Sequence, residues 1–364
     1  MPLQATGVAD VLISSLNNLG RLKFTDLMSP YQNTIALKRI FKKHKTKLEG
    51  GYGPEFQFNI MYNTNGSARH VPIGYVSVVD IPNVMTNGKM PWRHTTWNWA
   101  VERRVIAMNQ GDARIVDMAM EQRMASFGDA IKLFETTLWT VPSATNFAIN
   151  PVGIPYFVVK SSTDAAGDTT YDGFNGTVPS GYTLVANIDP SATNTLRYRN
   201  YADAYVDISK VDLFRKLRRA HYKTDFMPLV DNMPTYALGD DFGLYTNYKV
   251  TARTEELLES QNENLGQDVA SMEGRAMFAR IPITPVKLLD GDTDDPLYLI
   301  NWGELGAKAL QGEWMNEKHF PAEANQPTIS MTNTDCSWNL YCTNRRTQAV
   351  LSTGTSGTAS LVGA

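Results

Sequence analysis

The chain has 364 residues, of which 43% are hydrophobic and 20% are charged, and its formal net charge at pH 7 is -3. Such a length supports a large core and usually means two or more subdomains, while the near balance of charge argues against tight general binding of nucleic acid by the whole chain. No stretch approaches eighteen apolar residues and the N-terminus lacks the pattern of a secretory signal, so we expect a protein without a membrane span that is made in the cytoplasm. Cys336 and Cys342, the only cysteines, are predicted to be reduced and buried.

Residues 1–50 are predicted to form an arm rather than a domain. Within them, residues 37–48 place apolar side chains at helical spacing, which predicts a short amphipathic helix. Its other face would carry a set of basic side chains: Lys38, Arg39, Lys42, Lys43, Lys45 and Lys47. Such a face could contact nucleic acid, an anionic surface or an acidic partner, and an ordinary solvated face is an equally good interpretation.

Residues 51–105 are predicted to form a long protruding β-hairpin with an irregular tip. One strand is indicated by the alternation of Phe56, Phe58 and Ile60 with polar residues, and the other by 93–101, where Trp97 and Trp99 share one face. A two-stranded arm buries too little surface to be stable alone. We therefore expect it to contact another subunit.

The most regular stretch of the chain is 112–138, which is predicted to be one long helix. Its apolar side chains recur at steps of three and four residues: Val116, Met120, Met124, Phe127, Ile131, Phe134 and Leu138. Asp112 is a plausible N-cap, and Pro142 ends the element soon after the stripe stops. The polar face, which is expected to include Asp129 and Glu135, carries charges of both signs. One apolar stripe under such a face predicts a strut that lies across a sheet.

The rest of the chain alternates short helices, strands and loops. Residues 143–200 are rich in turn residues but contain enough apolar side chains to suggest a folded excursion with short strands. A basic helix is predicted at 209–223 with Ser209 as its cap, and an acidic helix at 254–268 with Thr254 as its N-cap. Strands are predicted within 281–289, 296–302, 328–334 and 338–342, before a low-complexity tail.

No motif in the sequence supports an enzyme or a bound cofactor. The five histidines are scattered, and the dinucleotide, P-loop and hydrolase signatures are missing. The aspartates at 290, 292, 294 and 295 have spacing similar to a calcium loop but lack its glycine and glutamate, so a solvated turn is the better interpretation. Asp240 and Asp241 are neighbours whose side chains point apart on most backbones. The tryptophans could stack bases or sugars, but large residues on a half-buried hairpin need no ligand.

Several ordered blocks, spread over about residues 50–353, resemble the major capsid proteins of tailed bacteriophages. The blocks are WRHTTWNWAVERRVIAMNQGDARIVDMAMEQRMASFGDAIKLFETTLW, GIPYFVV, GFNG, PSGY, KVDLFRKLRRAHYKTDFMPLVDNMPTYALGDDFGLYTN, LESQNENLGQDVASMEGR, LYLINWG and NLYCTNRRTQAVLST. The resemblance implies an α+β chain with the HK97-like capsid fold. It also implies a structural, non-enzymatic subunit found in the virion and made in the cytoplasm of a bacterial host.

The resemblance divides the chain into an arm, an extended loop, a peripheral domain and an axial domain. The implied boundaries are 1–50 for the N-terminal arm, 51–107 for the extended loop, 108–223 for the peripheral domain with spine helix 112–138 and insertion 143–200, 224–316 for the axial domain, 317–353 for the return to the peripheral domain, and 354–364 for a flexible tail. Its implied partners are further copies of the chain in hexamers and pentamers, packaged double-stranded DNA, and scaffold, portal and decoration proteins.

We expect the extended loop to contact a neighbouring subunit and the basic arm to face the lumen. The loop would be anchored by Trp92, Trp97 and Trp99, while Arg103 and Arg104 would pair with acidic groups of a neighbour. An equal alternative is that the tryptophans pack only in the hairpin's own core. The six basic residues named above would touch DNA weakly. Removing residues 70–92 is expected to leave a folded subunit that forms no closed shells.

Three other functions stay open at this stage. A nanocompartment shell of the encapsulin type would share the fold but enclose protein. A β-rich carbohydrate-binding or tail module would use the tryptophans as sugar platforms and form no shells. An enzyme using Asp240 or the 290–295 aspartates would lose its activity when they are mutated.

Overall fold

The computed structural model describes residues 34–41, 46–49, 53–63, 66, 68–76, 83–108, 112–166, 168, 170–192, 195–224, 242–262, 276–279, 281–320 and 328–353. The elements are α2 (Ile35–Ile40), β1 (Thr46–Glu49), β2 (Glu55–Met61), β3 (Met85–Pro91), β4 (Arg93–Glu102), α3 (Arg103–Met108), α4 (Asp112–Leu138), η1 (Asn146–Ala148), α5 (Ile154–Phe157), β5 (Tyr201–Tyr205), α6 (Leu213–Thr224), β6 (Phe242–Thr246), α7 (Tyr248–Asn262), β7 (Met277–Phe278), β8 (Ile281–Pro285), η3 (Lys287–Leu289), β9 (Leu297–Asn301), β10 (Leu305–Leu310), β11 (Asn316–Phe320), β12 (Ile329–Cys342), η4 (Arg345–Thr347) and β13 (Ala349–Thr353).

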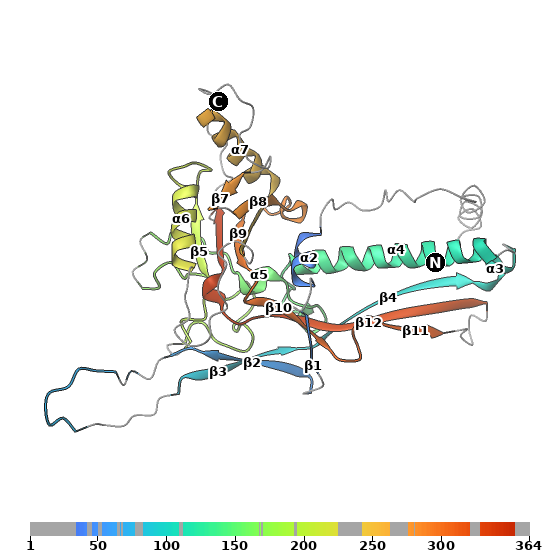
Figure 1. The fold of residues 1–364 in the computed structure, drawn as a ribbon, viewed down its shortest axis with the longest axis horizontal. Coiled ribbons are helices and arrows are strands. Elements are labelled where there is room, and N and C mark those ends of the chain that lie inside the picture. Colours follow the sequence, from blue (N-terminus) through green and yellow to red (C-terminus); the bar gives the residue numbers. More distant parts are fainter. Residues whose placement is uncertain are drawn as a thin grey trace.

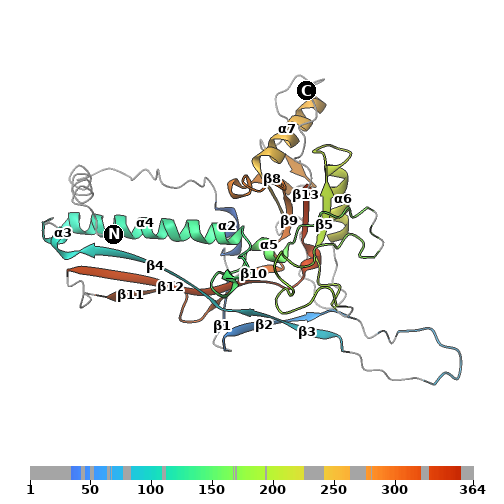
Figure 2. The same ribbon diagram turned by 180° about the vertical axis from the view of Figure 1, so that it is seen from behind.

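The first sheet is built around β12. Its order is β1-β10-β12-β11, and β4 pairs antiparallel with β12 from Glu102 opposite Ile329 to Arg93 opposite Trp338. The long helix α4 lies along β4 and β12 in both views (Figure 1 and Figure 2). Aromatic rings fix this packing, since Phe134 of α4 lies 5.2 Å from Trp338 and 5.9 Å from Trp97 between ring centroids. The predicted strut across a sheet is therefore confirmed, with bounds that match 112–138.

The second sheet stands beside the first and has its own apolar core. Its strand order is β5-β13-β9-β6-β8-β7, and Figure 1 shows it rising away from the plane of α4, with α7 at its far end. The amphipathic helix α6 lies on this sheet because Leu213, Leu217 and Ala220 recur on one face and are buried. The chain passes from β12 of the first sheet to β13 of the second through the short turn η4.

The predicted hairpin pairs differently from our expectation. β2 pairs with β3, from Glu55 opposite Pro91 to Met61 opposite Met85, whereas 93–102 forms β4 of the first sheet. The alternating pattern of β4 identified a strand but could not identify its partner, because the same period serves either pairing. The β2–β3 ribbon points away from α4 in both views (Figure 1 and Figure 2).

Other predictions at the helix ends need correction. The helix expected at 37–48 stops at Ile40, and residues 46–49 instead form β1, parallel to β10. Thr254 is not an N-cap: it lies inside α7, where its hydroxyl donates to the Val250 carbonyl, and the cap is supplied by Asn247 Oδ1, which accepts from Val250 N at 3.0 Å. The basic helix begins at Leu213, so Ser209 precedes it by a turn and its hydroxyl accepts from Asp212 N.

The excursion at 143–200 is folded, as expected, but is mostly irregular. Ile154, Tyr156 and Val158 are buried in the core of the first sheet, and only isolated bridges such as Phe174 to Ala202 replace the predicted short strands. Within the described residues no helix combines the length and the apolar character needed to cross a membrane.

Candidate functional site: assembly surfaces

The β2–β3 ribbon and the loop that joins its strands form the most exposed surface of the described chain. Val71, Ile73, Tyr75 and Val76 of the loop are all exposed. At the other end of the ribbon, Phe56, Phe58 and Met90 are buried in the main core. The Phe58 ring lies over Gly88 so closely that an added Cβ would stand 2.5 Å from it. The ribbon is therefore held firmly at its base and presents apolar side chains at its tip.

The tryptophans expected at subunit contacts are divided between core and surface. Trp92 is buried against Phe56 at 4.9 Å between ring centroids. Trp97 packs edge-on against Phe127 of α4 at 5.7 Å. Trp99 is half-buried on β4, opposite Thr332. The contacts described for Trp92 and Trp97 lie within the chain, and a role for any of the three between subunits stays a prediction.

The charged candidates lie at two separate places. Arg103 and Arg104 are exposed where β4 passes into α3, and no ion pair is described for either. Lys38 and Arg39 are exposed on α2, which lies at the other end of α4 from α3. The Arg39 side chain hydrogen-bonds Tyr245 at the base of the second sheet. The other four basic residues of the predicted arm helix are not described in full. Lys42, Lys43 and Lys45 lie outside the described residues, and for Lys47 the structure describes only the backbone of β1.

A buried glutamate ties the N-terminal part of the chain to α4. Glu135 is only 1% exposed, and its carboxylate accepts from Ala36 N at 3.1 Å, from Leu37 N at 2.8 Å and from the indole of Trp139 at 2.9 Å. Two of these donors are the orphan N–H groups of the first turn of α2, which a carboxylate satisfies well. The side chain was expected on the polar face of α4, and the structure places it in the core instead.

Replacing Glu135 with alanine is expected to lower the free energy of unfolding by about 2–4 kcal/mol, because three buried donors lose their acceptor. Urea denaturation of the unassembled chain measures this change. The matched control is Asp129→Ala on the exposed face of the same helix, which should change stability by less than about 0.5 kcal/mol. Equal effects of the two substitutions would contradict the anchoring role.

A buried arginine holds the 143–200 excursion against the turn between the two sheets. Arg345 is 1% exposed and donates to the carbonyls of Phe157 (2.7 Å), Tyr198 (3.0 Å), Gly176 (3.3 Å) and Thr177 (2.9 Å), and to Asn200 Oδ1 (3.1 Å). Its burial lowers the pKa of the guanidinium. No carboxylate is among the acceptors described, so carbonyl dipoles alone satisfy the charge. Sequence reasoning did not single out this residue.

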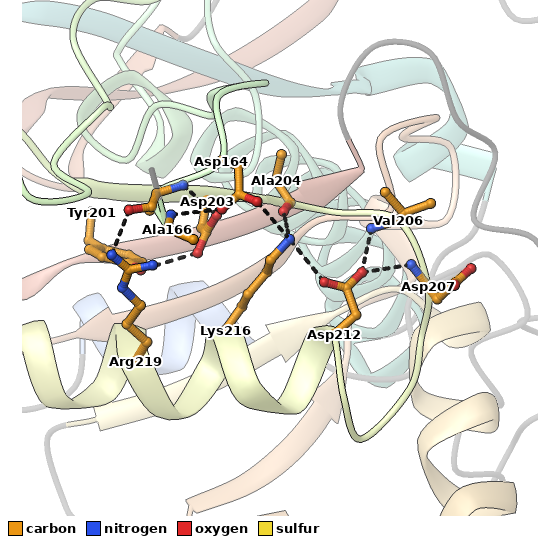
Figure 3. A network of polar contacts seen from close by, with 11 residues as sticks. Asp164, Ala166, Tyr201, Asp203, Ala204, Val206, Asp207, Asp212, Lys216 and Arg219 are labelled. Atoms are coloured by element: carbon orange, nitrogen blue, oxygen red, sulfur yellow. Dashed lines mark hydrogen bonds and ion pairs between the residues drawn. The ribbon is translucent and has the colours of Figure 1, made fainter. Parts of the chain in front are cut away.

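A second polar network fastens α6 to β5 (Figure 3). Lys216 points from α6 to the Asp212 carboxylate at 2.9 Å and lies 3.8 Å from Asp164. Asp203 of β5 is buried, and its carboxylate accepts from Ala165 N at 2.9 Å and from the Tyr201 hydroxyl at 3.2 Å. Burial raises the pKa of the Asp203 carboxyl above its usual value of 3.8.

The raised pKa of Asp203 predicts a pH dependence of stability. Because the folded chain binds this proton more tightly than the unfolded chain, the stabilisation is complete below the unfolded pKa and is lost as pH rises through the folded pKa. The difference in unfolding free energy between wild type and Asp203→Asn should therefore fall as the pH rises above the usual carboxyl pKa of 3.8, by about 1.4 kcal/mol for each pH unit by which the folded pKa exceeds the unfolded one. A constant difference over this range, measured by urea denaturation, would contradict the prediction.

Three of the four aspartates within 290–295 contact lysines, and the fourth, Asp290, accepts from Tyr248 N at 2.8 Å. Lys160 contacts both Asp292 and Asp294, and Lys249 contacts Asp295. Within the described residues no group of three His, Cys, Asp or Glu side chains could hold a metal ion, and Asp240 and Asp241 lie outside those residues. The two cysteines are free and buried, as predicted, and burial raises the pKa of Cys336 to about 11.

Comparison with solved structures identifies the fold. A capsid of a native GTA particle matches with a TM-score of 0.56 at 10% identity, over 93% of this chain and 96% of that one. The capsid of cyanophage A-1(L) matches with a TM-score of 0.57 at 11% identity, over 91% and 95%. The mature capsid of bacteriophage PhiM1 matches with a TM-score of 0.51 at 10% identity, over 92% of each chain. The chain has the HK97-like capsid fold.

The HK97-like fold is established here by structure and not by sequence. No protein-family model matches the chain, and no curated protein matches it. The likeness spans more than nine-tenths of this chain in each of the three comparisons. At 10% to 11% identity it shows the fold alone.

Proposed function

We propose that the chain is the major subunit of an icosahedral phage head, assembling as hexamers and pentamers around packaged double-stranded DNA. The observation that supports this most is the likeness to capsid structures over nearly the whole length of both chains. The exposed ribbon loop adds support, because an apolar protrusion of this size is covered in a stable assembly. The role is structural rather than enzymatic.

In this proposal the parts follow the order that the sequence analysis expected, but their boundaries shift: β4 and β10 join the peripheral sheet, and β5, α6 and β13 join the axial sheet. Residues 1–50 act as the arm and the ribbon with its loop as the extended loop. The first sheet with α4 is the peripheral domain, and the second sheet with α6 and α7 contains the axial domain. The exposed Lys38 and Arg39 face the lumen, and Trp99, Arg103 and Arg104 lie at a boundary with a neighbour. Scaffold, portal and decoration proteins are further partners.

Negative-stain electron microscopy of the tag-free protein after gel filtration tests the proposal. Closed polyhedral particles, or rings of five and six subunits, are the expected result, and particles from infected or expressing cells should release double-stranded DNA on disruption. Particles that release only protein would instead indicate a nanocompartment shell. A monodisperse monomer or trimer that binds glycans would overturn the proposal that the chain forms a shell.

A further inference from the structure

One face of α4 is covered at its C-terminal end and open further back. Met124, Gly128, Ile131 and Glu135 follow one another at steps of four, three and four, so they lie in one row along the helix. Glu135 is buried under α2, whereas Met124 is 55% exposed and Ile131 is 40% exposed. The row thus continues the α2–α4 interface beyond the point where α2 begins. Its apolar members are therefore only partly covered by the described residues.

Gly128 gives an independent sign that another backbone approaches this row. Glycine inside a helix lowers helix stability relative to alanine, so its presence there needs a reason. A Cβ built at Gly128 meets no atom within 4 Å, which means that no described neighbour requires the glycine. The same open space would let a second backbone lie close to α4 at this position.

The chain that leads into α2 begins at the covered end of the row. In the first turn of α2, Ala36 N and Leu37 N donate to Glu135, and Lys38 N donates to the Thr34 carbonyl. From Glu135 back to Met124 is eleven residues of helix, or about 16 Å. About five extended residues or eleven helical ones span that length. The segment just before Thr34 is apolar enough to cover it: Leu22, Phe24, Leu27, Met28 and Tyr31.

We propose that residues 22–33 pack along the Met124, Gly128 and Ile131 row of α4 in the same chain. The occupant is the chain's own N-terminal segment because the described chain starts at Thr34, two residues before Ala36, whose N–H donates to Glu135, and the new contact continues an interface that already exists. The arm is then attached to the long helix of its own subunit before it reaches any neighbour. Both readouts below are made on single chains, so they are independent of whether shells form.

Disulfide trapping in the full-length chain tests the contact. Phe24→Cys, Leu27→Cys and Met28→Cys are each combined with Ile131→Cys, and the buried Cys336 and Cys342 stay in place. At least one pair is expected to oxidise within a single chain more than fivefold faster than the same cysteine paired with Leu133→Cys. Leu133 is the matched control because it is 50% exposed but lies about 200° around the helix from Ile131. Equal rates at the two positions, or bonds formed only between chains, would overturn the proposal.

Limited trypsin digestion gives a second readout without engineered cysteines. Arg21 and Lys23 lie at the start of the proposed segment, so its docking protects them. Ile131→Asp is expected to speed cleavage there at least tenfold, whereas Leu133→Asp should leave the rate unchanged. Cleavage that is equally fast in wild type and both variants would show that the segment does not dock on this row.

Discussion

Removing residues 66–82 from the loop between β2 and β3, with an Asn-Gly turn joining the strands, is expected to give a folded subunit that no longer closes into shells. The deleted residues include the exposed apolar side chains of the tip, Val71, Ile73, Tyr75 and Val76. Each 1.4 kcal/mol of contact free energy lost at a boundary lowers the association constant about tenfold, and a shell repeats that loss at every boundary. The yield of closed particles, counted by electron microscopy, should therefore fall below detection.

The position of the cut follows from the strand pairing. The deletion of 70–92 that the sequence suggested would remove β3 with the buried Met90 and Trp92, and would damage the core rather than the tip. The matched control replaces 66–82 with glycine and serine at constant length, which keeps the reach of the loop but not its apolar side chains. Both variants should unfold in urea at the wild-type midpoint. Normal particles from either one would contradict the proposed contact.

Replacing Arg345 with methionine is expected to lower the free energy of unfolding by about 3–5 kcal/mol. Methionine fills most of the space but removes all five hydrogen bonds, and the carbonyls of Phe157, Tyr198 and Thr177 lose the donor described for them. Urea denaturation of the unassembled chain measures the loss. Arg345→Lys should recover little of it, since an ammonium group cannot reach acceptors spread around a planar guanidinium.

The neighbouring Arg346 serves as the control for Arg345. Its guanidinium lies 4.5 Å from the Phe174 ring centre and its side chain is half-buried, so Arg346→Met should cost only about 0.5–1 kcal/mol. The two substitutions remove the same charge from adjacent positions and differ in burial. If Arg345→Met stayed within 1 kcal/mol of wild type, the carbonyl cluster would not depend on the arginine.

Local patterns predicted elements well and pairings poorly. The apolar period gave the bounds of α4, and the strands at 281–285 and 297–301 fall within predicted stretches. The pairing of β4 with β12 joins residues more than two hundred positions apart, and a local sequence pattern carries no information about a partner that far along the chain. Residues 46–49 became a strand because β10 offered a free edge, which overrides a weak helical period.

The polar residues that organise the core were the least predictable part of the site. Glu135 had a usable signal: at 100° per residue it lies about 40° from Ile131, inside the apolar stripe and not opposite to it. Arg345 and Asp203 had none, since their acceptors and donors come from the irregular excursion, whose path depends on the whole fold. The capsid resemblance found the architecture without assigning a role to these residues, because it rested on the order of blocks along the chain.

The short turn that contains Arg345 also joins the two sheets. The hydrogen bonds from Arg345 to the 143–200 excursion therefore affect how the two sheets can move relative to each other. The turn connects β12 directly to β13, and the arginine fixes it to Phe157 and Tyr198 on the way. The hydrogen bonds that Arg345 donates resist bending of the turn between the two sheets. In the proposed shell, this turn would hold the two sheets in one orientation, and the β2–β3 ribbon with its exposed loop would be the part able to shift when the shell changes shape.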